Sequence, residues 1–200
     1  THEFDRVETL IAEADDMLAT FNALLRIARI ELGETKAERV SLALDKLIED
    51  VVELYEPLAL EKGIHLQLEL YPTECVADRN LLFQACANIV DNAIKYTPQG
   101  GNVQVSLSQG DQYGFDGHLG GSDNKEASVT FSVLDSGCGI DQSNYKKVLR
   151  RFYREESSRS LQPGNGLGLS LVAAVAKLHD FQLIFKPNDP GLQVHLHMQG

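Results

Sequence analysis

The sequence contains little that would suit a secreted, membrane-spanning or nucleic-acid-binding protein. Its three cysteines, Cys75, Cys86 and Cys138, are too few and too scattered for a disulfide framework or a zinc site, so we expect small buried residues of a reducing compartment. Lys and Arg total 18 against 29 Asp and Glu, and the net charge of -11 opposes nucleic acid or an anionic membrane as the main partner. The longest apolar run, around residues 169–176, is less than half of the roughly 18 residues that a membrane span needs. Because the chain opens with Thr1 and a polar stretch, we expect no secretory leader and a cytoplasmic location.

Residues 1–34 are predicted to form one long helix that needs a partner. Apolar residues recur three and four positions apart without a break, the heptad pattern of a coiled coil or helical bundle. The seam consists of Phe4, Val7, Ile11, Ala14, Leu18, Phe21, Leu25, Ala28 and Leu32, and Leu10, Met17 and Leu24 widen it toward a bundle. Gly33 is a plausible stop signal. A helix this apolar on one side is not stable alone in water, so we predict a homodimer formed through residues 1–34.

Residues 35–200 are predicted to form a compact α/β domain. Hydrophobic periodicity and turn residues define its elements. We expect helices over 45–62, from Asp78 to 96, and from about 170 to 178, and strands over 64–70, 74–77, 103–107, 129–134, 181–185 and 192–198. The polar, glycine-rich stretch 109–126 is expected to be a flexible loop without evident chemistry.

The helix that includes residues 84–96 has one apolar and one polar stripe. The apolar stripe is Leu82, Ala85, Ile89 and Ala93, and the polar stripe is Gln84, Asn88, Asn92 and Lys95. Asn is a mediocre helix former, so two of them in mid-helix need a reason. An amide oxygen can ligate Mg²⁺, and a nearby Lys can meet phosphate oxygens. The alternative is a solvated stripe that tolerates two Asn.

Two glycine-rich stretches follow. In 134–140, Asp135 ends a strand, where its carboxylate could accept a hydrogen bond from the exocyclic amine of adenine, and the two glycines would let the backbone approach a flat ligand. The alternative is an ordinary turn. In 163–169, glycines lead into a helix whose N-terminus would favour phosphate. The alternative there is a mobile linker.

Between these stretches lies 150–154, Arg-Arg-Phe-Tyr-Arg. Arginines around aromatic residues in a polar loop suit a lid that closes over phosphate. The alternative is a solvated, charged helix end.

In combination, these motifs are far more specific than any one of them. In this order and spacing they resemble the ATP-binding domain of sensor histidine kinases, within the GHKL superfamily of ATPases and kinases, over residues 36–200. The matching stretches are 88–96 (N box), 135–139 (G1 box), 151–154 (F box) and 164–169 (G2 box). One departure is His179-Asp180-Phe181, where the family often has His-Gly-Gly, and we expect it to change a turn rather than the nucleotide site.

The resemblance implies roles for individual residues. Asn92 would ligate Mg²⁺ between the ATP phosphates, and Asp135 would bind the adenine amine. Asn88, Lys95 and Arg154 would be catalytic, the first two by contacting phosphate oxygens. The remaining cofactor-binding residues would be Tyr96, Gly137, Gly139 and Ile140 around the base, and Phe152, Tyr153, Gly164, Asn165, Gly166, Leu167, Gly168 and Leu169 in the lid and around the triphosphate.

The resemblance also implies a fold and an activity. The expected fold is α+β, a two-layer sandwich with a mixed sheet covered by helices on one face and preceded by the bundle-forming helix. Related ATPases of topoisomerases and chaperones carry a Glu base where this chain has Asn88, and an amide cannot take a proton from water, so we expect phosphoryl transfer rather than rapid hydrolysis.

The acceptor would be a histidine of a missing first helix, with relay to a response regulator receiver domain as partner. Residues 1–34 would be the second helix of the dimerisation and phosphotransfer domain, and 35–200 the catalytic domain. A serine or mitochondrial-type kinase of the superfamily, or an inert dimerising scaffold, remains as an alternative.

Overall fold

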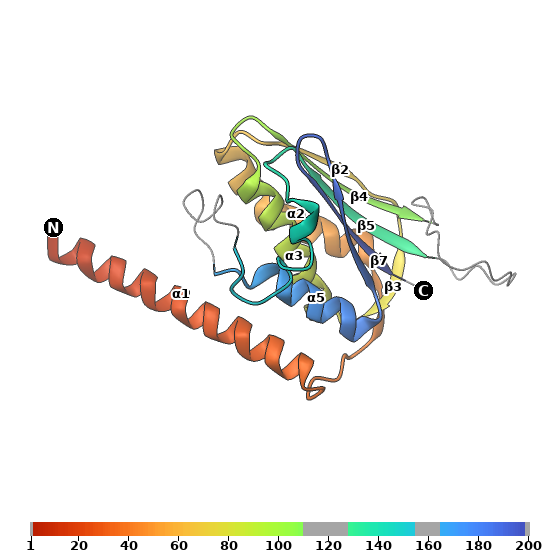
Figure 1. The fold of residues 1–200 in the computed structure, drawn as a ribbon, viewed down its shortest axis with the longest axis horizontal. Coiled ribbons are helices and arrows are strands. Elements are labelled where there is room, and N and C mark those ends of the chain that lie inside the picture. The colour runs from red at the N-terminus through yellow and green to blue at the C-terminus, as the bar shows by residue number, and fades with distance from the viewer. Residues whose placement is uncertain (1, 110–127, 155–164, 199–200) are drawn as a thin grey trace, which may run out of the picture.

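The computed structural model describes residues 2–109, 128–154 and 165–198, apart from the side chains of part of the first helix. That helix, α1 (His2–Glu31), projects from the body of the molecule (Figure 1). It ends where predicted, with Gly33 at a positive φ of 72° just beyond. Within the described residues, no helix combines the length and the apolar composition required to cross a membrane.

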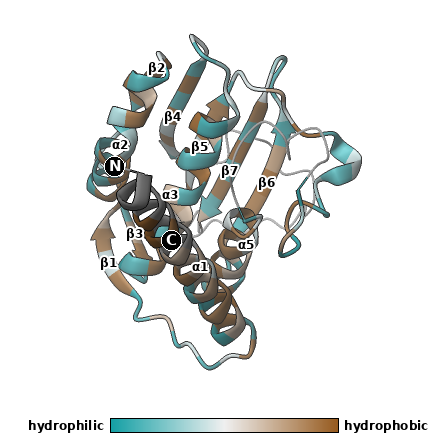
Figure 2. Ribbon diagram, turned by 90° about the vertical axis from the view of Figure 1, so that its left-hand side faces the viewer, coloured by the Kyte–Doolittle hydropathy of each residue, from teal (hydrophilic) through white to brown (hydrophobic). Residues whose placement is uncertain are grey.

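The body has two layers, as predicted. Five strands form a mixed sheet in the order β2-β4-β5-β7-β6, in which only the β2–β4 pair is parallel (Figure 2). Helices α2, α3 and α5 cover one face of this sheet (Figure 1). The strands are β2 (His65–Glu69), β4 (Asn102–Gln109), β5 (Val129–Asp135), β6 (Gln182–Pro187) and β7 (Leu192–Met198), and the helices are α2 (Leu44–Glu61), α3 (Arg79–Tyr96) and α5 (Gly168–His179). A short 3₁₀ helix, Gln142–Asn144, follows β5.

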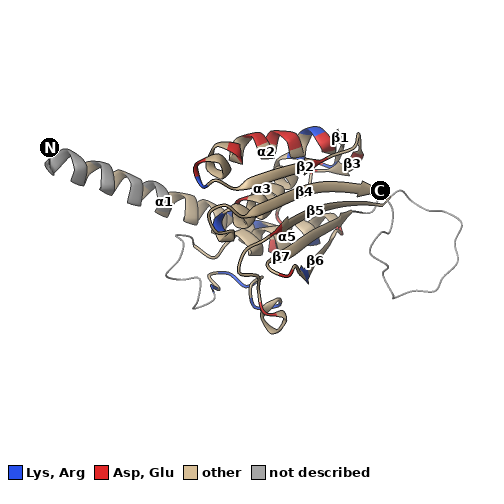
Figure 3. Cartoon of the chain, turned by 90° about the horizontal axis from the view of Figure 1, so that it is seen from above, with Lys and Arg blue, Asp and Glu red and all other residues tan. Residues whose placement is uncertain are grey.

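The core lies between the helices and the inner face of the sheet. The apolar stripe of α3 is buried as predicted, and it packs with alternate residues of the central strands, such as Val105 and Phe131. By contrast, α2 turns an acidic face outward, with Glu49, Asp50 and Glu53 exposed (Figure 3). Because the apolar stripe of α3 packs on the sheet, the polar stripe of the same helix is turned away from the main core.

Two details differ from the sequence expectations. A strand that was not predicted, β1 (Val40–Ala43), pairs antiparallel with β3 (Glu74–Ala77), and α2 starts directly after it. The expected inward face of the 64–70 strand is only partly covered, since Leu68 is 42% exposed, because β2 lies at the edge of the sheet. The 109–126 loop lies outside the described residues, except that Gln109 ends β4.

The predicted seam of α1 is mostly exposed. The side chain of Phe4 is outside the described residues, but Val7, Ile11, Leu18 and Phe21 are more than half exposed. Among the side chains of α1 that the structure describes, Ile27 and Ile30 are buried instead, and they join the main core on another face near the end of the helix. Packing on the domain therefore leaves the heptad seam available for a partner.

Candidate nucleotide-binding site

Both ends of α3 are fixed by capping interactions. Asp78 is the N-cap, and its Oδ1 accepts hydrogen bonds from the backbone N–H groups of Asn80 (3.0 Å) and Leu81 (3.1 Å). At the other end, the Lys62 ammonium donates to the carbonyls of Ile94 (2.8 Å) and Lys95 (2.7 Å). These contacts hold the polar stripe of α3 in a defined orientation.

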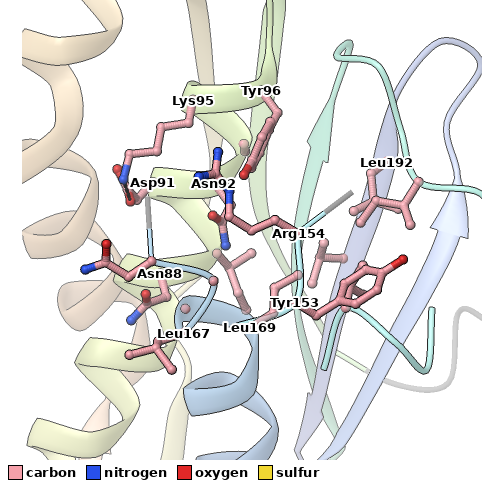
Figure 4. A pocket seen from close by; sticks show the side chains of 18 of the residues that line it. Asn88, Asp91, Asn92, Lys95, Tyr96, Tyr153, Arg154, Leu167, Leu169 and Leu192 are labelled. Carbon is pink, nitrogen blue, oxygen red and sulfur yellow. Dashed lines mark hydrogen bonds and ion pairs between the residues drawn. The ribbon is translucent and has the colours of Figure 1, made fainter. Parts of the chain in front are cut away.

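The two mid-helix asparagines of α3 face the start of α5 (Figure 4). Asn88 Nδ2 donates to the Gln84 carbonyl (2.8 Å), while the side chain of Asn92 makes no hydrogen bond to the described residues. A Cβ on Gly168 would lie 2.7 Å from Asn88 Oδ1 and 3.4 Å from Asn92 Nδ2. Only a glycine lets the first turn of α5 come this close to the asparagines.

The N-terminus of α5 has no side-chain cap, because Leu167 occupies the N-cap position. Its backbone N–H groups therefore lack the oxygen that Ser, Thr or Asp would supply. Leu167, Gly168 and Leu169 all line the same cavity as the asparagines. An uncapped helix start beside amide side chains suits an anion such as phosphate.

Asp135 lines the cavity at the end of β5, near Tyr96 at the C-terminal end of α3. It is only 6% exposed, and its Oδ1 accepts from the backbone N–H groups of Gly137 (2.8 Å) and Leu192 (3.3 Å). Burial raises the pKa of this carboxyl above its ordinary value, and the two N–H donors counteract the rise in part. The other oxygen, Oδ2, has no hydrogen-bond partner among the described residues, so it is available to a ligand that donates.

The glycines of the stretch 135–139, which resembles the G1 box, are required by close backbone packing more than by contact with a ligand. A Cβ on Gly137 would lie 2.6 Å from the Tyr96 carbonyl oxygen, and Gly137 does not line the cavity. Gly139, which has a positive φ of 68°, does line it, and a Cβ there would lie 2.8 Å from the Gly191 carbonyl oxygen. These glycines allow the loop after Asp135 to pack against the end of α3 and the β6–β7 turn.

The cavity between α3, α5 and the ends of β5 and β7 has a volume of about 480 Å³. It brings together most of the residues that the sequence singled out. They are Asn88, Asn92, Lys95, Tyr96, Asp135, Gly139, Ile140, Tyr153, Arg154, Asn165, Gly166, Leu167, Gly168 and Leu169. Gly137 and Phe152 are not in the lining, and Gly164 lies outside the described residues.

Several lining residues were not expected from the sequence. Asp91 forms an ion pair with Lys95 (2.6 Å), and their i,i+4 spacing could have indicated it. Leu192 and Val194 of β7 supply an apolar wall that no local motif announces. Cys138 also lines the cavity and is exposed, so the expectation of three buried cysteines is wrong for this one, because it follows the strand on an open loop.

Residues of α1 lie beside the cavity and contact described residues at or next to the ends of the stretch 152–165, which is the predicted lid. The Phe152 N–H donates to the Gly166 carbonyl (2.9 Å), which joins the two described ends of the 152–165 stretch. Phe152 itself has a positive φ of 61° and is 56% exposed. Arg151 pairs with Glu31, Asn165 donates to Thr20, and the cavity lining includes Ala19, Thr20 and Ala23 of α1. No sequence signal placed α1 beside this site.

Comparison with known protein families identifies this architecture. Residues 77–199 match the family described as histidine kinase-, DNA gyrase B- and HSP90-like ATPases. The chain belongs to this ATPase family. The ATPase match begins just before the cap of α3 and continues to the end of the last strand, so it includes all the elements around the cavity except α1.

Named relatives of this ATPase domain are sensor kinases. The histidine-protein kinase/phosphatase MprB of Mycobacterium bovis is 31% identical over 186 residues, which is 92% of this chain and 33% of the relative. The virulence sensor protein BvgS of Bordetella bronchiseptica is 32% identical over 200 residues, 95% of this chain and 15% of the relative. The chain thus spans a third or less of the length of these relatives.

Solved structures show the same fold. Full-length ShkA in complex with AMPPNP has a TM-score of 0.76 at 24% identity, over 98% of this chain and 38% of that one. The histidine kinase AdeS of Acinetobacter baumannii has a TM-score of 0.75 at 16% identity, over 96% and 83%. Both alignments include nearly the whole chain, so the likeness in fold extends over almost all of it.

Proposed function

We propose that this chain is the catalytic part of a two-component sensor kinase, which binds Mg-ATP and transfers its γ-phosphoryl group to a histidine. The observation that supports this proposal is a single cavity with two chemically distinct ends. One end has amide side chains and an uncapped helix start, and the other has a buried carboxylate with one available oxygen.

The triphosphate belongs at the α3–α5 end. The α5 N–H groups, Asn88 and Lys95 would hold its oxygens, and Arg154 at the base of the lid adds a positive charge to the same cavity. Among the described residues, no three His, Cys, Asp or Glu side chains come together as a metal site. Asn92 lines the cavity and its amide oxygen is a suitable hard ligand, so it would hold Mg²⁺ together with phosphate oxygens. The bound ion would neutralise phosphate charge.

The adenine ring belongs at the Asp135 end. Its exocyclic amine is a donor, which matches the available Oδ2, and Ile140, Leu192 and Val194 provide apolar surface for the ring. Guanine presents a carbonyl oxygen at the equivalent position, which would face the carboxylate without a proton between them. We therefore expect selection of ATP over GTP.

The chemistry proposed is transfer, not hydrolysis. The bond between the γ-phosphorus and the oxygen of the β-phosphate breaks, a bond to an imidazole nitrogen forms, and ADP leaves. The residue one turn before Asn92 is Asn88, whose amide cannot accept a proton from water. Positioning and charge neutralisation by Asn88, Lys95 and Arg154 would support the transfer.

Residues 1–34 would contribute the second helix of a dimeric phosphotransfer domain, and 35–200 the catalytic domain. The exposed seam of α1 supports a homodimer, since it is apolar and lies apart from the face that packs on the domain. A response regulator receiver domain would be the next acceptor.

We predict that Leu18→Glu together with Phe21→Glu lowers the mass measured by sedimentation equilibrium toward that of a monomer. An unchanged mass would contradict dimerisation through the α1 seam.

The test of the main proposal is calorimetric titration of the chain with ATP, with and without Mg²⁺, beside the Asn92→Ala variant. We expect Mg²⁺ to tighten binding in the native chain and to have little effect in the variant. Labelled ATP and a supplied phosphoacceptor histidine domain should then give an acid-labile phosphoprotein. Identical titrations of the two proteins would refute the proposed site, and an acid-stable product would refute histidine as the acceptor.

A further inference from the structure

The two helices of the nucleotide site are connected at a second point, far from the cavity. The backbone N–H of Asp78, the N-cap of α3, donates to Nε2 of His179, the last residue of α5 (3.0 Å). His179 is 3% exposed, and its Nδ1 lies 2.9 Å from the Val175 carbonyl oxygen. A side chain thus joins the beginning of α3 to the end of α5.

The partners of this imidazole determine where its proton lies. A backbone N–H can only donate, so Nε2 must accept and carry no hydrogen. A carbonyl can only accept, so Nδ1 must carry the hydrogen and donate it to Val175. The bridge exists only in the neutral ring with its proton on Nδ1, because a doubly protonated ring has no acceptor for the Asp78 N–H.

The position of the bridge relates it to the nucleotide site. From Asp78 to Asn88 is ten residues along α3, and from His179 back to Gly168 is eleven along α5, which correspond to about 15 and 16.5 Å of helix. Because His179 meets Asp78 while Gly168 meets Asn88, the two helices run antiparallel and are matched in length between their two contacts. A slip at the His179 end would therefore displace Gly168 from the asparagines.

The residues that follow α1 join at the same point. The Glu38 N–H donates to Asp78 Oδ2 (3.1 Å), and the Arg39 guanidinium donates to the Leu178 carbonyl (2.7 Å) and to Asp180 (3.0 Å). Arg39, Asp78 and Asp180 are the charged groups that face the imidazole, and the Phe181 ring stacks on it with centroids 5.2 Å apart. Asp180 adopts the left-handed conformation (φ 61°) that glycine often takes after a helix. The helix end therefore keeps this turn even though Asp180 stands where the family often has the first Gly of His-Gly-Gly.

We propose that His179 is a positioning residue of the nucleotide site, whose neutral imidazole fixes the register of α5 against α3 and so presents the α5 N-terminus to the phosphates. The inference rests on the proposed function. Burial lowers the pKa of His179, and the positive charge of Arg39 lowers it too, whereas the contact with Val175 and the two aspartates raise it. The net shift is downward, so the bridging form is favoured at neutral pH. Acidification below the ordinary range of histidine would break the bridge.

The experiment compares two substitutions in the 200-residue chain. His179→Gln can place an amide oxygen near the position of Nε2 and does not titrate, whereas His179→Phe keeps the bulk and removes the acceptor. We expect the Phe variant to bind Mg-AMPPNP about five- to tenfold more weakly at pH 8 and the Gln variant to bind like the native chain. From pH 8 to pH 5, the native chain should lose affinity more steeply than the Gln variant.

A measurement without nucleotide keeps the inference testable if the Phe variant does not fold. Nitrogen NMR of the native chain should show His179 with its proton on Nδ1 at pH 8. A proton on Nε2, equal binding by the folded Phe variant, or identical pH profiles of the native and Gln proteins would overturn the inference. Absence of nucleotide binding by the native chain at every pH would instead refute the proposed function, while the NMR signal would still report on the bridge.

Discussion

Gly168→Ala provides a sensitive test of the contact between α5 and the two asparagines. The added methyl would lie 2.7 Å from Asn88 Oδ1, closer than van der Waals contact allows, and Asn88 is held by its bond to the Gln84 carbonyl. Gly168 does not have a positive φ, so the substitution adds a steric conflict and no backbone strain. We therefore expect the Asn88 side chain to move and its hydrogen bond to Gln84 to be lost.

The effects on stability and on binding should differ. Losing the Asn88 bond costs about 1 kcal/mol, and replacing Gly by Ala in a helix returns up to about 1 kcal/mol, so the free energy of unfolding should change little. Nucleotide binding should weaken at least tenfold, which corresponds to about 1.4 kcal/mol, because the methyl and the displaced amide occupy the phosphate end of the cavity. The assay is calorimetric titration with Mg-AMPPNP, with thermal unfolding measured on the same samples.

Ala173→Gly is the matched control. Ala173 lies five residues further along α5, outside the cavity lining, and the change lowers helix propensity by about 1 kcal/mol. It should lower the melting temperature and leave nucleotide affinity within about twofold of the native value. If Gly168→Ala binds nucleotide normally, or if both variants lose the same affinity, the steric argument is wrong.

Three further substitutions test other parts of the structure. Asp135→Asn should raise the melting temperature at neutral pH, because burial has raised the pKa of this carboxyl and penalises its charge, yet it should weaken ATP binding in the same titration because the amide nitrogen cannot accept from adenine. Burial, and next the positive charge of Lys186, lowers the pKa of His195 to about 4, so the folded state keeps this ring neutral. The stability that depends on the neutral ring is fully present above about pH 6.5, the ordinary pKa, and is lost as the pH falls toward 4. Urea unfolding at pH 7 and pH 4.5 should show His195→Gln losing less stability than the native chain, by on the order of 3 kcal/mol at most. Lys62→Met should lower the free energy of unfolding by about 1–2 kcal/mol, and an unchanged urea midpoint would show that its two bonds to the end of α3 contribute nothing.

The parts of the fold that could be predicted are those encoded in short periodic segments. The alternation from Val103 to Leu107 and the asparagine-bearing helix were predictable because each reports its own environment over a few residues. β1 was missed because its four residues, Val-Ser-Leu-Ala, have no alternating buried face, since only Leu42 is partly covered, and its partner β3 lies more than 30 residues away. The exposure of Leu68 depends on the place of β2 at the sheet edge, which only the topology decides.

The candidate site likewise combines residues that short motifs predict with residues that only the overall topology brings together. Its glycine-rich and asparagine-bearing stretches were found because each needs particular residue types at fixed spacing. The lining by Thr20 and Leu192 was not found, because those residues are ordinary within α1 and β7 and reach the cavity only through the packing of distant elements. The His179–Asp78 bridge joins residues 101 positions apart, and the sequence alone suggested only a modified turn there.

The environments of the three thiols have a practical consequence for spectroscopy. Cys75 and Cys86 are buried, and desolvation raises the pKa of the Cys75 thiol to about 11 and that of Cys86 further still, so both resist alkylation at neutral pH. Cys138 is exposed beside the candidate adenine end. A maleimide dye should therefore attach at one position without any mutagenesis, and its emission would follow occupancy of the cavity in real time.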